Sequence, residues 1–307
     1  MITLKNVTKY FGNVKAVNDL SFSVDSGEVI GFLGPNGAGK TTTLRMMTGF
    51  LSPDRGSISI DGIDIERDPV SAQKKIGYLP ENNPLYTTML VSEFLDLAAR
   101  LHQVPPSDCK EATGRVVHAV GIEEMFYRPI RELSKGFRQR VGIAAALIHQ
   151  PDIIILDEPT EGLDPNQRGD IRTLIKDLAK KHTVVMSTHV MQEASAVCSR
   201  LLILNKGGIA ADGTAEELAA NAEGKRILSL DIEGSEVTPE LTKLVGKEAF
   251  SIKKQRQDRI SATLSLEKGR EIRPDISKLA WKHHWIVWDM HEEERKLEDI
   301  FQALTKE

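Results

Sequence analysis

The segment at residues 34–41, GPNGAGKT, constrains the fold of this chain more than any other feature. It fits the pattern G-x-x-x-x-G-K-[ST], in which glycines let backbone N–H groups close around phosphate oxygens that larger residues would obstruct. A buried apolar strand is predicted just before it, at Val29–Leu33, and a helix just after it, from Lys40 to Thr48. The positive N-terminal end of that helix would point at the same anion. We therefore predict a phosphate-binding loop at a strand-to-helix junction.

This loop predicts that the chain binds a nucleotide together with a metal ion. Lys40 is expected to reach the β- and γ-phosphates, and Thr41 to offer its hydroxyl to Mg²⁺. The residues of the loop and helix start that we expect to contact the nucleotide are Gly34, Pro35, Asn36, Gly37, Ala38, Gly39, Lys40, Thr41 and Thr42.

A second segment, residues 153–158 (IIILDE), is an apolar run that ends in two adjacent carboxylates. Such a run alone is weak evidence, because apolar strands often end in solvated acidic residues. Downstream of a phosphate-binding loop it indicates a metal site at the carboxyl edge of a parallel sheet. Asp157 would hold Mg²⁺ directly or through water, and Glu158 would be the general base for an attacking water.

The order of the predicted elements indicates an α/β fold. After residue 150, strands and helices alternate, which predicts a mainly parallel sheet covered on both faces. These elements are Ile153–Leu156 (strand), Pro165–Lys180 (helix), Thr183–Ser187 (strand), Val190–Val197 (helix), Arg200–Asn205 (strand) and Thr214–Asn221 (helix). The strands Ile2–Val7 and Leu20–Val24 and the hairpin Gly56–Ile65 predict an antiparallel β subdomain, and residues 82–150 an inserted helical subdomain.

A smaller second domain is expected after this one. The first domain is predicted at residues 1–222, and residues 222–225 read as a linker. Residues 225–307 show the order β-α-β-β-α-β of a ferredoxin-like α+β domain, followed by an amphipathic helix at Arg295–Leu304. The run from Trp281 to Trp288, rich in Trp, His and Lys, could bind metal or nucleic acid or supply core aromatics; we adopt the last interpretation.

Composition and the apolar runs limit the partners and the cellular location that we expect for the protein. The net charge of −4 gives no reason to expect a nucleic-acid partner. Cys109 and Cys198 could pair, but two free thiols in a reducing compartment fit better. The first residues lack a signal-peptide pattern, and apolar runs such as Val141–Ile148 fall short of the ~18 residues of a membrane span. The expected location is the cytoplasm, at the inner face of the cell membrane through a partner.

Over residues 1–220 the chain resembles the ABC ATPase family. Several further segments are similar to motifs of this family. Residues 133–137 (LSKGF) are similar to the family signature LSGGQ, and residues 161–164 (EGLD) to its D-loop. His189 resembles the switch histidine. Phe11 takes the place of the aromatic residue that stacks on adenine, with Tyr10 as the alternative.

The resemblance implies an ATP-hydrolysing enzyme that works as a dimer. Two copies would pack head to tail, so that Ser134 and Gly136 of one copy cap the γ-phosphate held by the other. The N-terminal end of the signature helix would add its dipole. The catalytic residues would be Glu158, His189 and Lys40, and the cofactors ATP and Mg²⁺.

Three positions depart from the family pattern. Glu81 stands where most members have Gln; it can still offer an oxygen to Mg²⁺ but adds a negative charge beside ATP. Lys135 and Phe137 replace Gly and Gln in the signature, while Gly136 is retained. Lys135 is either an extra cation near phosphate or a solvated side chain, and we adopt the second interpretation.

These variants and the end of the chain are similar to the stand-alone ATPase subunits of bacterial ABC exporters of the gliding-motility and drug-resistance types. The expected function is therefore to power export by a separate membrane-spanning permease, which would insert a short helix into a groove near Glu81. The alternatives are a soluble ABC ATPase that acts on a ribosome, DNA or metallocluster scaffold, and a module that holds ATP without turnover. The C-terminal domain is expected to stabilise the dimer or regulate turnover.

Overall fold

The computed structural model describes residues 1–221, 226–256, 258–267, 270–293 and 301. The predicted linker at 222–225 lies outside the described residues, as does nearly all of the predicted helix at Arg295–Leu304. The chain forms two compact units, one of Met1–Leu218 and the other within Ala219–Ile300.

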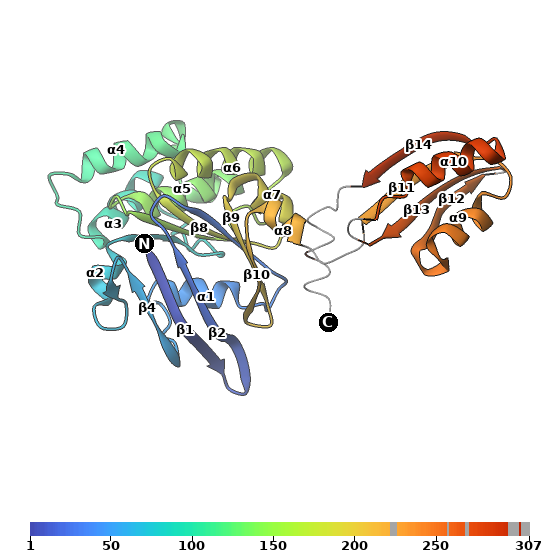
Figure 1. Ribbon diagram of the computed structural model, residues 1–307. Coiled ribbons are helices and arrows are strands. Elements are labelled where there is room, and N and C mark those ends of the chain that lie inside the picture. The colour runs from blue at the N-terminus through green and yellow to red at the C-terminus, as the bar shows by residue number, and fades with distance from the viewer. Residues whose placement is uncertain (222–225, 257, 268–269, 294–300, 302–307) are drawn as a thin grey trace. The chain divides into compact units, whose positions relative to one another are not determined.

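The first unit is built on a six-stranded sheet with the order β10-β9-β3-β8-β7-β6. Its strands are β3 (Val29–Leu33), β6 (Ile76–Leu79), β7 (Ile153–Asp157), β8 (Thr183–Thr188), β9 (Arg200–Asn205) and β10 (Gly208–Gly213). All neighbours are parallel except β10, which pairs antiparallel with β9. The predicted α/β class is confirmed, while β6 and β10 were not among the predicted strands. Figure 1 shows α5, α6 and α7 on one side of this sheet and α1 on the other.

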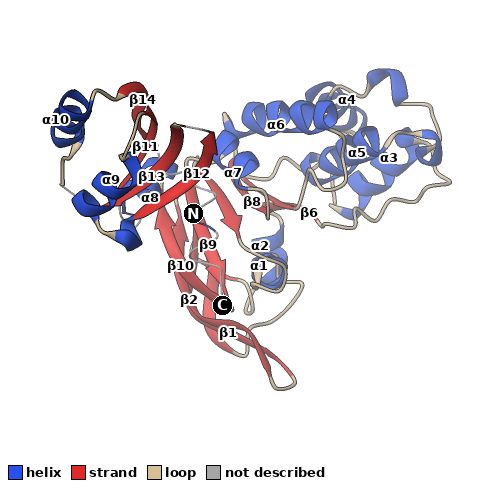
Figure 2. Ribbon diagram, turned by 90° about the vertical axis from the view of Figure 1, so that its right-hand side faces the viewer, coloured by secondary structure: helices blue, strands red, loops and turns tan. Residues whose placement is uncertain are grey.

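The helices of the first unit connect or follow its strands along the chain. They are α1 (Lys40–Met47), α2 (Pro69–Gln73), α3 (Val91–Leu101), α4 (Cys109–Val120), α5 (Lys135–Leu147), α6 (Pro165–Ala179), α7 (Met191–Val197) and α8 (Ala215–Asn221), with 3₁₀ turns at Glu123–Met125 and Ile130–Glu132. Figure 2 shows α3, α4, α5 and α6 grouped at one end of the unit.

The antiparallel sheet of the first unit has the order β2-β1-β4-β5. Its strands are β1 (Ile2–Phe11), β2 (Val14–Val24), β4 (Arg55–Ile60) and β5 (Ile63–Asp64). Strands β1 and β2 are longer than predicted, because they continue through polar residues to a two-residue turn at Gly12 and Asn13, with Phe11 opposite Val14. This extension carries Phe11 away from the core to the tip of the hairpin.

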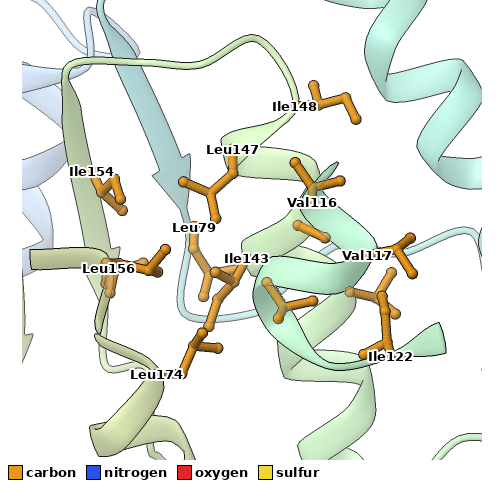
Figure 3. Packing of buried hydrophobic residues seen from close by; sticks show 14 of the residues in the cluster. Leu79, Val116, Val117, Ile122, Ile143, Leu147, Ile148, Ile154, Leu156 and Leu174 are labelled. Carbon is orange, nitrogen blue, oxygen red and sulfur yellow. The ribbon is translucent and has the colours of Figure 1, made fainter. Parts of the chain in front are cut away.

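Two apolar cores hold the first unit together. One lies between the sheet and α1 with the antiparallel strands, and the other between the sheet and α3 to α6. In the second core, Ile154 and Leu156 of β7 face Ile143 and Leu147 of α5 (Figure 3). Each fully buried Leu or Ile contributes about 1.5–3 kcal/mol. These contacts fix the end of β7, and with it the carboxylates of Asp157, its last residue, and Glu158, which follows.

The second unit is a four-stranded antiparallel sheet with the order β12-β13-β11-β14. Its elements are β11 (Arg226–Glu233), α9 (Val237–Val245), a 3₁₀ turn (Lys247–Ala249), β12 (Phe250–Arg256), β13 (Arg259–Leu266), α10 (Arg273–His283) and β14 (Ile286–Glu293). This is the predicted ferredoxin-like arrangement. Trp285 is buried in its core and donates its Nε1–H to the carbonyl of Ser235 at 2.8 Å, whereas Trp281 and Trp288 are exposed. Among the described residues no cluster of His, Cys, Asp or Glu side chains could hold a metal ion.

Candidate active site

The phosphate loop connects β3 to α1 as predicted, and two of its glycines are required by close backbone approach. A Cβ on Gly34 would lie 2.6 Å from the carbonyl oxygen of Leu204, and one on Gly39 would lie 2.6 Å from that of Ala16. Gly39 also has a φ of +100°, which disfavours any other residue. As the N-cap of α1, Gly39 offers no side-chain acceptor, so the first N–H groups of the helix are free to bind an anion.

A cavity of about 640 Å³ lies over this loop. Its lining residues are Phe11, Val14, Lys15, Ala16, Pro35, Asn36, Gly37, Ala38, Gly39, Lys40, Thr41, Thr42, Glu81, Glu158, Glu161 and Lys206. Phe11 is half exposed, so its ring is available for stacking on a planar ligand. Tyr10, the alternative aromatic residue, is not part of the lining, and its ring is covered by the Lys15 ammonium group.

Lys40 lines the same cavity, and its side chain is almost fully buried. Its Nζ donates to the carbonyl of Gly34 at 2.7 Å and lies 3.4 Å from Oε1 of Glu158, which is also buried. A buried ammonium group needs partners for its charge and its donors. Lys40 therefore bridges the phosphate loop and the carboxylate that follows β7.

Asp157 is fully buried at the end of β7, and only one of its carboxylate oxygens is satisfied. Oδ1 accepts hydrogen bonds from Ser187 at 2.6 Å and Thr41 at 3.2 Å, whereas Oδ2 has no hydrogen-bond partner. An unpaired buried carboxylate oxygen is costly unless a ligand completes it. A carboxylate beside a threonine hydroxyl fits the oxygen-donor preference of Mg²⁺. The residues present thus fit the predicted ion.

Several carboxylates lie near Asp157. Burial raises the pKa of the Glu81 carboxyl, and the neighbouring carboxylates of Glu161, Asp157 and Glu158 raise it further. Burial, followed by the charge of Asp157, raises the pKa of Tyr78 to about 12. Burial is the larger cause of both shifts, and the part that comes from the neighbouring carboxylates is one that a divalent cation would offset.

Glu158 is held by contacts from three directions. Its backbone has a φ of +48°, and its N–H donates to Oγ of Ser187 at 2.9 Å. Its Oε1 faces Lys40, and its Oε2 lies 3.0 Å from Nδ1 of His189. A left-handed backbone at a non-glycine residue persists only when its surroundings impose it. This arrangement presents a buried carboxylate, oriented by a histidine, to the cavity.

The signature residues lie apart from this cavity. Ser134 is the N-cap of α5 and accepts a hydrogen bond from the N–H of Phe137 at 3.3 Å; its side chain is exposed. Gly136 packs against Gln167, where a Cβ would lie only 3.1 Å from its side chain. Neither residue lines the cavity of its own chain. Lys135 folds over Gly162, where a methyl group would overlap its Nζ, so it contacts the D-loop.

Three residues that the sequence analysis did not assign also belong to the site. Ser187 of β8 ties Asp157 and Glu158 together, because parallel pairing places it directly opposite Asp157. Lys15 and Lys206 line the cavity from the β1–β2 hairpin and the β9–β10 turn. Both lysines could have been found from the hairpins that carry them. The β1–β2 hairpin was predicted only in part, and the β9–β10 hairpin was not predicted.

This is a nucleoside-triphosphate site of the P-loop class, defined by the phosphate loop, the buried carboxylates of Asp157 and Glu158 and the half-exposed ring of Phe11. The model of the ABC transporter family matches residues 17–161. The "uncharacterized ABC transporter ATP-binding protein YxlF" of Bacillus subtilis (strain 168) is 38% identical over 218 residues, covering 71% of this chain and 72% of YxlF. The chain therefore belongs to the family of ABC transporter ATP-binding proteins, as its motifs predicted.

Another relative and one solved structure add detail. The linearmycin resistance ATP-binding protein LnrL of the same organism is 35% identical over 235 residues, covering 76% of either chain. A dimeric structure of the ATP-binding cassette MJ0796 in a post-hydrolysis state, bound to ADP and phosphate, has a TM-score of 0.63. It is 27% identical and covers 70% of this chain and 98% of MJ0796. No helix in the described part of this chain is long and apolar enough to span a membrane.

Proposed function

We propose that this chain is the Mg²⁺-dependent ATP-hydrolysing subunit of an ABC exporter and works as a homodimer. The observation that carries this proposal is the buried cluster of Lys40, Asp157 and Glu158 beneath a phosphate loop. We assign ATP binding and hydrolysis to residues 1–222 and an accessory role to residues 225–307.

The roles of the residues follow from their contacts. Lys40 would exchange its contact with Glu158 for the β- and γ-phosphates, which are stronger anionic partners. Glu158, thereby freed and still oriented by His189, would accept the proton of the attacking water. Thr41 and Asp157, with Glu81 nearby, would hold Mg²⁺, which supplies charge neutralisation at the phosphates.

The position of the signature motif supports a composite site. Ser134 is exposed and lies outside its own nucleotide cavity, at the N-terminal end of the thirteen-residue helix α5. Such an end attracts anions. In a two-fold dimer each copy presents the same surface to the other, so two signature ends would meet two phosphate loops. ATP would then join the copies, and hydrolysis would release them.

A groove beside the nucleotide cavity supports a membrane-spanning partner. A cavity of about 240 Å³ lies between β6 and helices α3 and α5, lined mostly by apolar side chains that include Leu85, Tyr86, Phe94, Leu97 and Leu101. It starts at Tyr78–Pro80, immediately before Glu81. We assign it to a short amphipathic helix of the permease, because apolar grooves of this kind receive the apolar face of a helix. This partner would hold the chain at the inner face of the cell membrane.

Replacing Leu101 by Asp tests this assignment. The side chain is 71% exposed at the rim of the groove, so the charge should cost little folding stability while blocking an apolar helix face. After purification of the tagged protein from detergent-solubilised membranes, we expect Leu101→Asp to lose a membrane-spanning protein that the wild type retains. Val70→Asp, at a 55% exposed position on α2 outside the groove, is the matched control. Equal recovery of that protein with both variants would contradict the assignment.

A further inference from the structure

The turn between β9 and β10 brings a third lysine, Lys206, to the nucleotide cavity. Asn205 pairs with Gly208, so Lys206 and Gly207 form a two-residue turn, and both have positive φ angles, +48° and +81°. This is the geometry of a type I′ hairpin turn. Lys206 is exposed and lines the cavity. Its position is therefore set by the hairpin.

The turn is hydrogen-bonded both to strand β2 and to the phosphate loop. The N–H of Asn18 donates to the carbonyl of Gly207 at 2.8 Å, and the N–H of Gly207 donates to the carbonyl of Ala38 at 3.2 Å. A Cβ on Gly207 would lie 2.8 Å from the carbonyl oxygen of Ala16. Backbone contacts thus hold the turn between the phosphate loop and strand β2, which pairs with the strand that carries Phe11. Lys206 stands at this junction.

The three lysines of the cavity differ in what they contact. Lys40 is bonded to Gly34 and paired with Glu158. Lys15 donates to Oδ1 of Asn18 at 3.1 Å, and its ammonium group covers the ring of Tyr10. Within the described part of the chain, Lys206 has neither a hydrogen-bond nor an ion-pair partner for its ammonium group. It is the cation of this cavity that remains available for a ligand.

We propose that Lys206 binds the phosphate group nearest the ribose of the bound nucleotide. The inference rests on the proposed function, in which the cavity takes ATP. In the proposed pose the base lies at Phe11 and the terminal phosphates lie at Lys40. Ala16, Ala38 and Gly39, which flank the turn, line the same cavity, and we place them between these two ends. A cation placed there meets the α-phosphate, which ATP and ADP share. Lys206 is thus a nucleotide-positioning residue outside the motifs of the family.

The test compares Lys206→Asn with Lys206→Arg and with Lys181→Asn, an exposed control position outside the cavity. Asn adopts positive φ more readily than Lys, so the turn should keep its stability while the charge is removed. By calorimetric titration we expect Lys206→Asn to weaken ATP and ADP binding alike, by about 3- to 10-fold. The salt dependence of binding should also decrease, because one ionic contact is lost. Lys206→Arg and Lys181→Asn should bind as the wild type does.

Other outcomes would overturn the inference in distinguishable ways. Unchanged affinity of Lys206→Asn, with a wild type that binds ATP, would remove Lys206 from the site. Loss of ATP affinity without loss of ADP affinity would place its contact at the γ-phosphate. A wild type that binds no ATP would instead contradict the proposed function itself.

Discussion

Glu158→Gln is expected to abolish ATP turnover while leaving ATP binding intact. The amide keeps the size of the side chain but cannot accept the proton of the attacking water, and general-base catalysis contributes about 10²–10⁴-fold to such reactions. Among the described residues, Glu158 is the carboxylate that contacts both Lys40 and His189. We therefore expect phosphate release to fall at least about 100-fold, with an ATP affinity equal to or tighter than that of the wild type.

A matched variant separates the role of Glu158 from a general effect of charge. Glu161→Gln removes a carboxylate from the lining of the same cavity but leaves the contacts of Glu158 with Lys40 and His189 in place. Its phosphate release should fall far less than that of Glu158→Gln. A near-normal rate for Glu158→Gln would exclude this residue as the base.

Lys40→Ala is expected to lose nucleotide binding and some folding stability together. The buried ammonium group is the cation beneath the phosphate loop, and charged hydrogen bonds in such a place contribute strongly. We expect ATP affinity to fall on the order of 100-fold, by titration calorimetry. The variant also leaves Glu158 buried without its cation, which should lower the free energy of unfolding by about 1–3 kcal/mol.

The double variant Lys40→Ala/Glu158→Gln distinguishes these two effects. Neutralising Glu158 removes the unpaired charge, so the free energy of unfolding should largely recover in denaturant titrations. Nucleotide binding should not recover, because the cation is still absent. If both properties recovered together, the loss of ATP affinity would be a consequence of misfolding and not of the missing lysine.

Sequence patterns predicted the parts of this site that lie within single segments. The loop at Gly34–Thr41 and the carboxylates after β7 each depend on a local strand end, and local hydrophobic patterns indicate strand ends well. The ferredoxin-like order of the second unit was predicted for the same reason. Strand β6 is only four residues long, too short for its pattern to stand out from the surrounding sequence.

Residues that act through pairing between distant segments were not predictable in this way. Ser187 reaches Asp157 only because β7 and β8 pair in one particular register across thirty positions. Lys206 depends on a hairpin whose second strand, β10, consists mostly of Gly and Ala and carries little hydrophobic signal. Lys135 is exposed, as expected, but its contact with Gly162 was not predicted, because it depends on how the chain folds after Glu158.

In the proposed dimer, each ATP site combines the phosphate loop of one copy with the signature motif of the other. The most direct test mixes Lys40→Ala, which keeps its signature, with Ser134→Arg, which keeps its phosphate loop, and measures ATP hydrolysis. Each variant alone should be inactive. In an equal mixture half the dimers carry one intact composite site, so activity should return to as much as about a quarter of the wild-type rate. A mixture as inactive as its components, with both variants folded, or full activity of Ser134→Arg alone, would contradict the account.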